Sequence, residues 1–149
     1  MKIEIKNYKR DSVMSEETEC FSATIYVDGV KAGTVSNRGH GGCNDYYWSN
    51  PVLGKQLEEY AQAQTTQYEF EKLDQLIDDI VAQVATEKQM KGWMKKHTCF
   101  RLKGDDRGTW RRLSGGPVDQ AATELLTKKY GDQLEIILTD SNITEAAKL

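Results

Sequence analysis

Cys20–Cys43 reads CFSATIYVDGVKAGTVSNRGHGGC, and this stretch decides the fold. Its first half alternates apolar and polar side chains, which predicts a β-strand with one buried face made of Phe21, Ala23, Ile25 and Val27. Asp28-Gly29 follows and is typical of a type I′ turn, because both residues tolerate positive φ angles. We therefore expect a return strand over 30–36, in which Gly33 marks a bulge or a close backbone approach.

The hairpin leads into a glycine-rich loop, Asn37–Asn44, and then into three consecutive aromatic residues at 46–48. The loop is not a nucleotide fingerprint, because it lacks the strand–loop–helix setting and the Gly-Lys-Ser/Thr ending of such motifs. Its backbone amides suit an anion-binding nest. We keep three interpretations: a structural turn, a partner-contacting loop and a small-ligand site.

Two helices are expected after the loop. Asn50 and Pro51 predict a helix start that continues to about Gln64. Thr65 or Thr66 caps a longer helix, whose apolar side chains recur at helical spacing and predict the main core helix. These side chains are Phe70, Leu73, Leu76, Ile77, Ile80, Val81 and Val84. We interpret the acidic residues in the first half of this helix as a solvated face.

The remaining chain predicts strands around one more helix. An N-terminal strand places Ile3 and Ile5 on one face, and a polar loop follows over 9–18. A second hairpin over 99–113 directs Phe100 and Leu102 to the core and Arg101 and Lys103 to the opposite face. A helix then buries a stripe and ends at Gly131, before a last strand with Leu134, Ile136 and Leu138 and a short helical turn or frayed tail. The stripe comprises Val118, Ala121, Ala122, Leu125 and Leu126.

This order of elements predicts an α+β fold, with antiparallel β-hairpins packed against a long central helix and two shorter helices. A chain of 149 residues is expected to form a single domain over 1–149. Its parts are an N-terminal strand, hairpin and loop (1–48), a helical segment (51–97) and a hairpin, helix and strand (98–140). A split into two lobes near 97–99 is the less favoured alternative.

The composition limits the classes of protein to which the chain can belong. No apolar run approaches the roughly 20 residues of a membrane span, and the N-terminus lacks the apolar region of a signal peptide. Three cysteines, odd in number and widely spaced, predict free thiols in a reducing cytoplasm. We therefore expect a cytoplasmic protein.

The net charge of −3 hides a strong asymmetry. Residues 91–112 carry 8 basic and 2 acidic side chains, whereas residues 1–90 carry 9 basic and 15 acidic ones. Trp93 and Trp110 lie among these basic residues, and such a mixture suits phosphate contacts and base stacking, or an acidic protein surface. The structural alternative is that the tryptophans belong to the core and the basic residues are scattered over several faces.

Metal binding and catalysis have weaker signals. His40 with Cys43 and His97 with Cys99 offer a Cys₂His₂ set, but the second spacing is too short for the usual zinc finger. Cys43 with either histidine could form a nucleophilic pair, although no orienting acid is identifiable. We therefore expect no catalytic residues, no cofactor and no metal, while a zinc or small-ligand protein centred on the glycine-rich loop remains an alternative.

Several motifs resemble a family of small, uncharacterised proteins of phages and prophages. They are MKIEIKNY (1–8), SEETECFSATIYVDGVKAGTVSNRGHGG (15–42), TCFRLKG (98–104), TWRR (109–112) and KKYGDQLE (128–135). The likeness covers nearly the whole chain but consists of fold and turn motifs. The family that these motifs resemble is loosely associated with type II anti-CRISPR proteins, which bind Cas9, although this chain lacks the strongly acidic net charge of a DNA mimic.

The resemblance implies a non-enzymatic protein of the bacterial host cytoplasm that binds and inhibits a host defence protein, with Cas9 or its guide-RNA complex as a candidate. The alternative is a nucleic-acid-binding protein that uses residues 91–112. We expect partner contacts from the glycine-rich loop and the basic segment. The candidate contact residues are Arg38, His40, Tyr46, Tyr47, Trp48, Lys95, Lys96, Arg101, Lys103, Arg107, Arg111 and Arg112.

Overall fold

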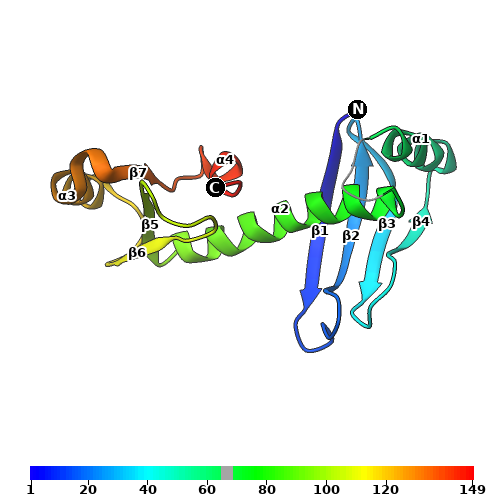
Figure 1. Cartoon of the computed structure of the whole chain (residues 1–149), viewed down its shortest axis with the longest axis horizontal. Helices are drawn as coiled ribbons and strands as arrows, with labels where there is room; N and C mark the ends of the chain where they lie inside the picture. The colour runs from blue at the N-terminus through cyan, green and yellow to red at the C-terminus, as the bar shows by residue number, and fades with distance from the viewer. Residues whose placement is uncertain (65–68) are drawn as a thin grey trace. The chain divides into compact units, whose positions relative to one another are not determined.

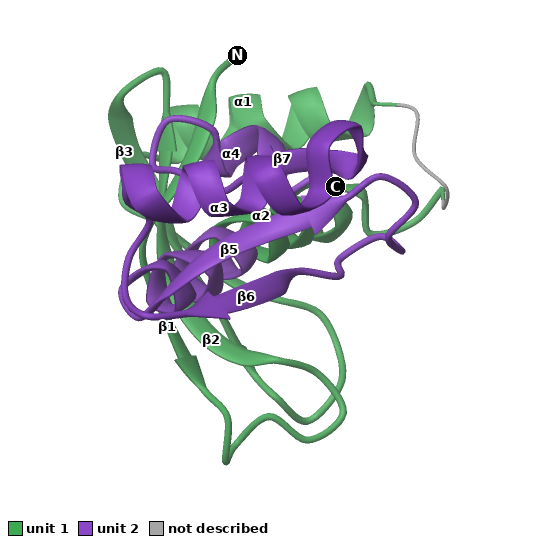
Figure 2. Cartoon of the chain, turned by 90° about the vertical axis from the view of Figure 1, so that its left-hand side faces the viewer, with its two compact units in different colours: residues 1–84 green, residues 85–149 purple. Residues whose placement is uncertain are grey.

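The computed structural model describes residues 1–64 and 69–149 and confirms an α+β fold (Figure 1). The chain divides into two compact units, Met1–Val84 and Ala85–Leu149, which Figure 2 colours separately. The boundary lies within helix α2 (Lys72–Met94) and not near residues 97–99. Folding of the chain as one domain stays a prediction. Each unit is described by itself.

The first unit contains an antiparallel sheet of order β1-β2-β3-β4. Its strands are β1 (Ile3–Asp11), β2 (Cys20–Val27), β3 (Val30–Arg38) and β4 (Asp45–Trp48). The predicted hairpin is confirmed: Phe21, Ala23, Ile25 and Val27 are buried on one face. Asp28 and Gly29 have φ angles of 49° and 80°, as a type I′ turn requires.

Strand β1 is longer than predicted and contains a bulge between Lys6 and Lys9. Asn7 lies at this bulge with a φ of 55°. Ile5 is buried before the bulge and Tyr8 after it, because the extra residue shifts the alternation of side chains by one position. Two apolar side chains therefore reach the core at a spacing that a regular strand does not allow.

Gly33 is a point of close approach, as the sequence predicts. The register between β2 and β3 shifts beside it, and a Cβ atom on Gly33 would lie 2.1 Å from the carbonyl oxygen of Tyr47 on β4. Strand β4 itself was not predicted, since its burial alternates over only four residues.

Helix α1 (Pro51–Gln62) begins as predicted, with the Asn50 side chain accepting from the backbone N–H of Leu53 at 3.2 Å. The predicted cap of α2 at Thr65 or Thr66 lies outside the described residues. Phe70 is wrong as a core residue: it precedes the helix and its side chain is 80% exposed. Ile77 and Val81 are buried, and the first half of α2 runs across the sheet of its unit (Figure 1).

The second unit contains a sheet of order β6-β5-β7, formed by β5 (His97–Leu102), β6 (Arg111–Ser114) and β7 (Leu134–Ile137). Helix α3 (Gln120–Tyr130), a 3₁₀ turn η1 (Gly131–Gln133) and helix α4 (Ile143–Ala146) complete it. Its core contains Met90, Cys99, Leu138, Ile143 and Ala146.

Helix α3 buries a narrower stripe than the sequence predicts. Leu126 is buried, whereas Leu125 is 52% exposed and Ala121 is exposed. Gly131 ends the helix with a positive φ, as expected. In the described part of the chain, no helix combines the length and the apolar character that crossing a bilayer needs.

Candidate interaction surfaces

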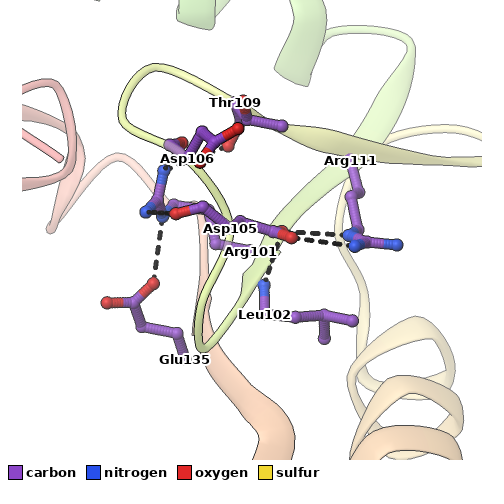
Figure 3. A network of polar contacts seen from close by, with 7 residues as sticks. All are labelled: Arg101, Leu102, Asp105, Asp106, Thr109, Arg111 and Glu135. Atoms are coloured by element: carbon purple, nitrogen blue, oxygen red, sulfur yellow. Dashed lines mark hydrogen bonds and ion pairs between the residues drawn. The ribbon is translucent and has the colours of Figure 1, made fainter.

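Arg101 is not the exposed contact residue that the sequence predicts. It is 5% exposed, because β5 is the central strand of its sheet and side chains cover both of its faces. Its Nε donates to Glu135 Oε2 at 3.0 Å, and its terminal nitrogens donate to the carbonyl oxygens of Asp105, Asp106 and Thr109 at 2.9–3.2 Å (Figure 3). Arg101 therefore holds the backbone of the loop between β5 and β6.

Asp105, which belongs to this loop, ties it to the backbone of Leu102 and to Arg111 (Figure 3). One carboxylate oxygen accepts from the backbone N–H of Leu102 at 3.0 Å, and both oxygens accept from Arg111 at 2.8–2.9 Å. The guanidinium of Arg111, followed by this backbone bond, holds the pKa of Asp105 well below its usual range. Arg111 is exposed, but its charge is already paired.

The two tryptophans of the basic segment pack against the core of the second unit. Arg112 lies over the ring of Trp93, with its Cζ 5.4 Å from the ring centroid, and Arg101 lies over Trp110 at 5.8 Å. The structural interpretation of these tryptophans is therefore confirmed. Both rings already have a cationic neighbour and a packed side, which disfavours them as a platform for stacked bases.

The remaining basic candidates are exposed. Within the described ranges, none of them has an acidic side chain in ion-pairing distance. We call this set the basic surface; Lys95 and Lys96 precede β5, Lys103 and Arg107 follow it, and Arg112 lies on β6. Lys103 and Arg107 lie on the loop that Arg101 and Asp105 hold. Unpaired cations on a fixed backbone are an arrangement suited to an acidic partner.

The glycine-rich loop is a turn held by internal hydrogen bonds, rather than an anion-binding nest of free backbone N–H groups. The buried Asn37 side chain accepts from Thr18 Oγ1 at 2.7 Å and from the backbone N–H of Gly39 at 2.9 Å, and it donates to the Gly42 carbonyl. The N–H of Gly41 donates to Thr18 Oγ1. These amides are therefore occupied within the protein, which disfavours the anion-binding interpretation.

Gly39 also anchors the preceding loop. Its carbonyl oxygen accepts from the N–H groups of Glu16, Glu17 and Thr18 at 3.0–3.5 Å. A Cβ atom on Gly39 would lie 2.2 Å from the Met14 carbonyl oxygen, and its φ is 82°. Glycine is required here both by conformation and by space.

The acidic residues of α2 have a role that the sequence did not reveal. Asn44 donates from its backbone N–H to Asp74 at 2.8 Å and from its side chain to Asp78 at 2.6 Å, and Tyr46 donates to Asp74 at 2.7 Å. Asp74 and Asp78 therefore bind the end of the glycine-rich loop, so the interpretation of a solvated face is incomplete for these two residues, although Asp78 is itself exposed. Burial is the main cause of the raised pKa values of Asp78 and Tyr46.

The aromatic candidates after the loop separate into two faces. The rings of Tyr46 and Trp48 stack with centroids 5.4 Å apart; Tyr46 contacts α2 through Asp74, and Trp48 covers Gly54 of α1. Tyr47 is 71% exposed on the opposite face. Arg38 and His40 are exposed, and His40 lies 3.2 Å from Glu16. Tyr47, Arg38 and His40 therefore remain accessible candidates, whereas Tyr46 and Trp48 serve the fold.

The histidines and cysteines lie in different environments. All three cysteines are free thiols, as expected. Cys43 donates to Glu71 at 3.3 Å, and this bond raises its pKa, while burial raises the pKa of Cys99. His97 Nδ1 is buried without a hydrogen-bond partner in the described part of the chain. Among the described residues, no three His, Cys, Asp or Glu side chains are grouped as metal ligands would be.

A cavity of about 330 Å³ lies beside the glycine-rich loop in the first unit. Asn37, Asn44 and Asp78 line its polar side, and Phe21 and Val81 line its apolar side. The amide groups of both asparagines are engaged in the contacts described above. The cavity is therefore a packing feature of the glycine-rich loop.

Comparisons with family models, with curated proteins and with solved structures found no match to this chain.

Proposed function

We propose that this protein acts by binding, and that the basic surface of residues 85–149 contacts an acidic surface of a partner protein. The observation that carries the proposal is the loop between β5 and β6. Arg101 and Asp105 fix its backbone, while Lys103 and Arg107 flank Asp105 and Asp106 on it and form no ion pair among the described residues. A fixed loop loses little conformational entropy on binding, so its charges are available for specificity.

The partner that we propose is a host defence protein, which the protein inhibits by occupying its surface. The sequence resemblance to phage and prophage proteins supports this part of the proposal. Cas9 with its guide RNA is the candidate that this resemblance favours. Inhibition would be stoichiometric, since a binding protein blocks one partner molecule at a time.

Nucleic acid is the second candidate partner of the same surface. The positive charge of the segment favours it. The packing of Trp93 and Trp110 against the core disfavours it, because single-strand binding commonly relies on exposed aromatic rings. We therefore place a protein partner first.

The test is affinity capture from a bacterial host lysate with the tagged full-length protein, comparing nuclease-treated and untreated halves. A protein retained after nuclease treatment, and lost when Lys95, Lys96, Lys103 and Arg107 are changed to Glu, is the expected result. Lys128→Glu with Lys148→Glu serves as the control, because both lysines are exposed and lie outside the basic surface. Recovery that disappears with nuclease would overturn the protein-partner proposal in favour of nucleic acid.

A Cas9 cleavage assay tests the candidate target separately. Titration of the full-length protein into Cas9 with its guide RNA should end cleavage near equimolar ratio. Full cleavage at large excess would remove Cas9 as the target and leave the capture experiment to name another.

A further inference from the structure

The outer face of the β1–β4 sheet is a second surface with a distinct composition. Directly opposed residues share a face, so the register places Lys6, Thr24, Thr34 and Tyr47 in one row. The next row comprises Lys9, Ser22, Ser36 and Asp45. In these two rows the central strands present short hydroxyl side chains, while the edge strands present Lys6, Lys9, Asp45 and Tyr47.

This arrangement forms a shallow trough along β2 and β3. It has a volume of about 420 Å³, and Asn7, Lys9, Ser22, Thr24, Thr34 and Ser36 provide its polar lining. Neighbouring strands lie roughly 4.8 Å apart, so a trough two strands wide has room for one extended peptide. None of the residues lining it is acidic.

The bulge in β1 places additional polar side chains on this face. A regular strand would turn every second residue inward, but here Lys6 and Lys9 both pair with outer-face residues, and Asn7 lines the trough between them. Asn7 adopts a φ of 55°, and its side chain contacts Thr24 Oγ1 at 3.4 Å. A non-glycine residue held in this conformation at a bulge is a feature that recurs at binding sites.

The charged side chains of this face indicate which kind of partner it binds. Lys6 lies over the ring of Tyr26, and in the described chain Lys9 has no acidic side chain in ion-pairing distance. Glu4 and Asp11 lie on the same face of β1, but Glu4 pairs with Lys2 at 3.2 Å and Asp11 accepts from the N–H groups of Val13 and Met14. Lys6 and Lys9 are therefore the basic side chains of this strand that form no ion pair among the described residues. Residues 1–84 carry 8 basic and 14 acidic side chains, and such a negative unit repels a polyanion. A peptide with a few carboxylates fits this local field better than nucleic acid does.

We propose that the outer face of the β1–β4 sheet binds an extended acidic peptide segment of a partner protein. Its carboxylates pair with Lys6 and Lys9, its backbone lies along the hydroxyl rows, and Tyr47 packs against an apolar side chain. Tyrosine, serine and asparagine together are the composition of adaptable protein-binding surfaces. This inference does not rest on the basic surface of residues 85–149.

The test is an amide chemical-shift titration of the ¹⁵N-labelled full-length protein with a short Thr-rich peptide that contains two Glu residues. We expect shifts confined to β1, β2, β3 and Tyr47, and a roughly tenfold weaker affinity after Lys6→Glu with Lys9→Glu. Lys55→Glu is the matched control, because it reverses an exposed charge on α1 of the same unit and should leave the affinity unchanged.

Two further titrations and one folding check complete the design. A peptide with Lys in place of Glu should produce no shifts on this face, and an oligothymidine should bind it more weakly than the acidic peptide. Amide spectra of the double variant should match the unbound wild type outside β1. Shifts elsewhere, equal shifts with the Lys peptide, unchanged affinity in the double variant, or tighter binding of oligothymidine at this face would overturn the proposal.

Discussion

The guanidinium of Arg111 meets the carboxylate of Asp105 side-on, with Nε 2.9 Å and Nη2 2.8 Å from its two oxygens. Arg111 lies at the start of β6, and Asp105 lies in the loop that leads to it. The pair therefore closes the loop that carries Lys103 and Arg107. A residue that appears in the sequence as one of many exposed cations serves instead to order its neighbours.

The first prediction concerns pH. The folded state lowers the pKa of Asp105, so the ionised carboxylate stabilises the fold above its unfolded pKa of about 3.9, and this contribution is lost as the pH falls toward the lower folded value. Asp105→Asn should therefore be less stable than wild type at neutral pH, and the difference should shrink below about pH 4. Urea unfolding of both proteins at several pH values measures it. A difference independent of pH would contradict the assigned role.

The second prediction concerns Arg101. Arg101→Met keeps much of the buried volume but leaves Glu135 and three loop carbonyls without their donor, so it should destabilise the fold by about 2–4 kcal/mol. Chemical denaturation measures the change. Arg107→Met, on the same loop but exposed, should change stability by less than about 0.5 kcal/mol. Equal effects of the two substitutions would refute the distinction between them.

The third prediction compares two helical glycines. A Cβ atom on Gly54 would lie 2.5 Å from the ring of Trp48, whereas one on Gly92 would meet nothing within 4 Å. Gly54→Ala should destabilise by about 1–2 kcal/mol despite its better helix propensity, and Gly92→Ala should stabilise by about 0.5–1 kcal/mol. Thermal unfolding of the two variants measures both. Stabilisation by both substitutions would show that Trp48 does not pack on α1 in this way.

The fourth prediction concerns the glycine-rich loop. Asn44→Ala removes the side-chain contacts to Asp78 and Asn37, so it should cost about 2–3 kcal/mol and speed amide hydrogen exchange at 39–44. His40→Ala, an exposed neighbour, should leave both quantities nearly unchanged. Unaltered exchange in Asn44→Ala would mean that α2 does not hold the loop.

The sequence predicted the elements that depend on local chemistry. The alternation in β2, the Asp28-Gly29 turn, the Asn50 cap and the Gly131 helix end all act within a few residues, and all four are confirmed. Side-chain orientation depends on tertiary layers, which the sequence does not display. Arg101 shows this limit, because the alternation placed it opposite Phe100 but could not reveal that the opposite face is also covered.

The site residues follow the same rule. Asp74 and Asp78 have the same charge and helical spacing as solvated residues, and their partners Asn44 and Tyr46 come from a segment distant in the sequence. The bulge at Asn7 has one detectable signal, since Ile5 and Tyr8 are both apolar at a spacing of three within a strand. This spacing could have predicted the bulge and, with it, the polar side chains on the outer face of the sheet.

Binding through the basic surface is the central claim, and calorimetric titration of the captured partner with the purified protein tests it most directly. We predict saturation at one molecule of protein per partner, an affinity that weakens with added salt, and at least a tenfold loss when Lys95, Lys96, Lys103 and Arg107 are changed to Glu, roughly 1.4 kcal/mol or more. Lys128→Glu with Lys148→Glu should bind as the wild type does. Wild-type affinity in the fourfold variant, with its fold intact by circular dichroism, would contradict the account.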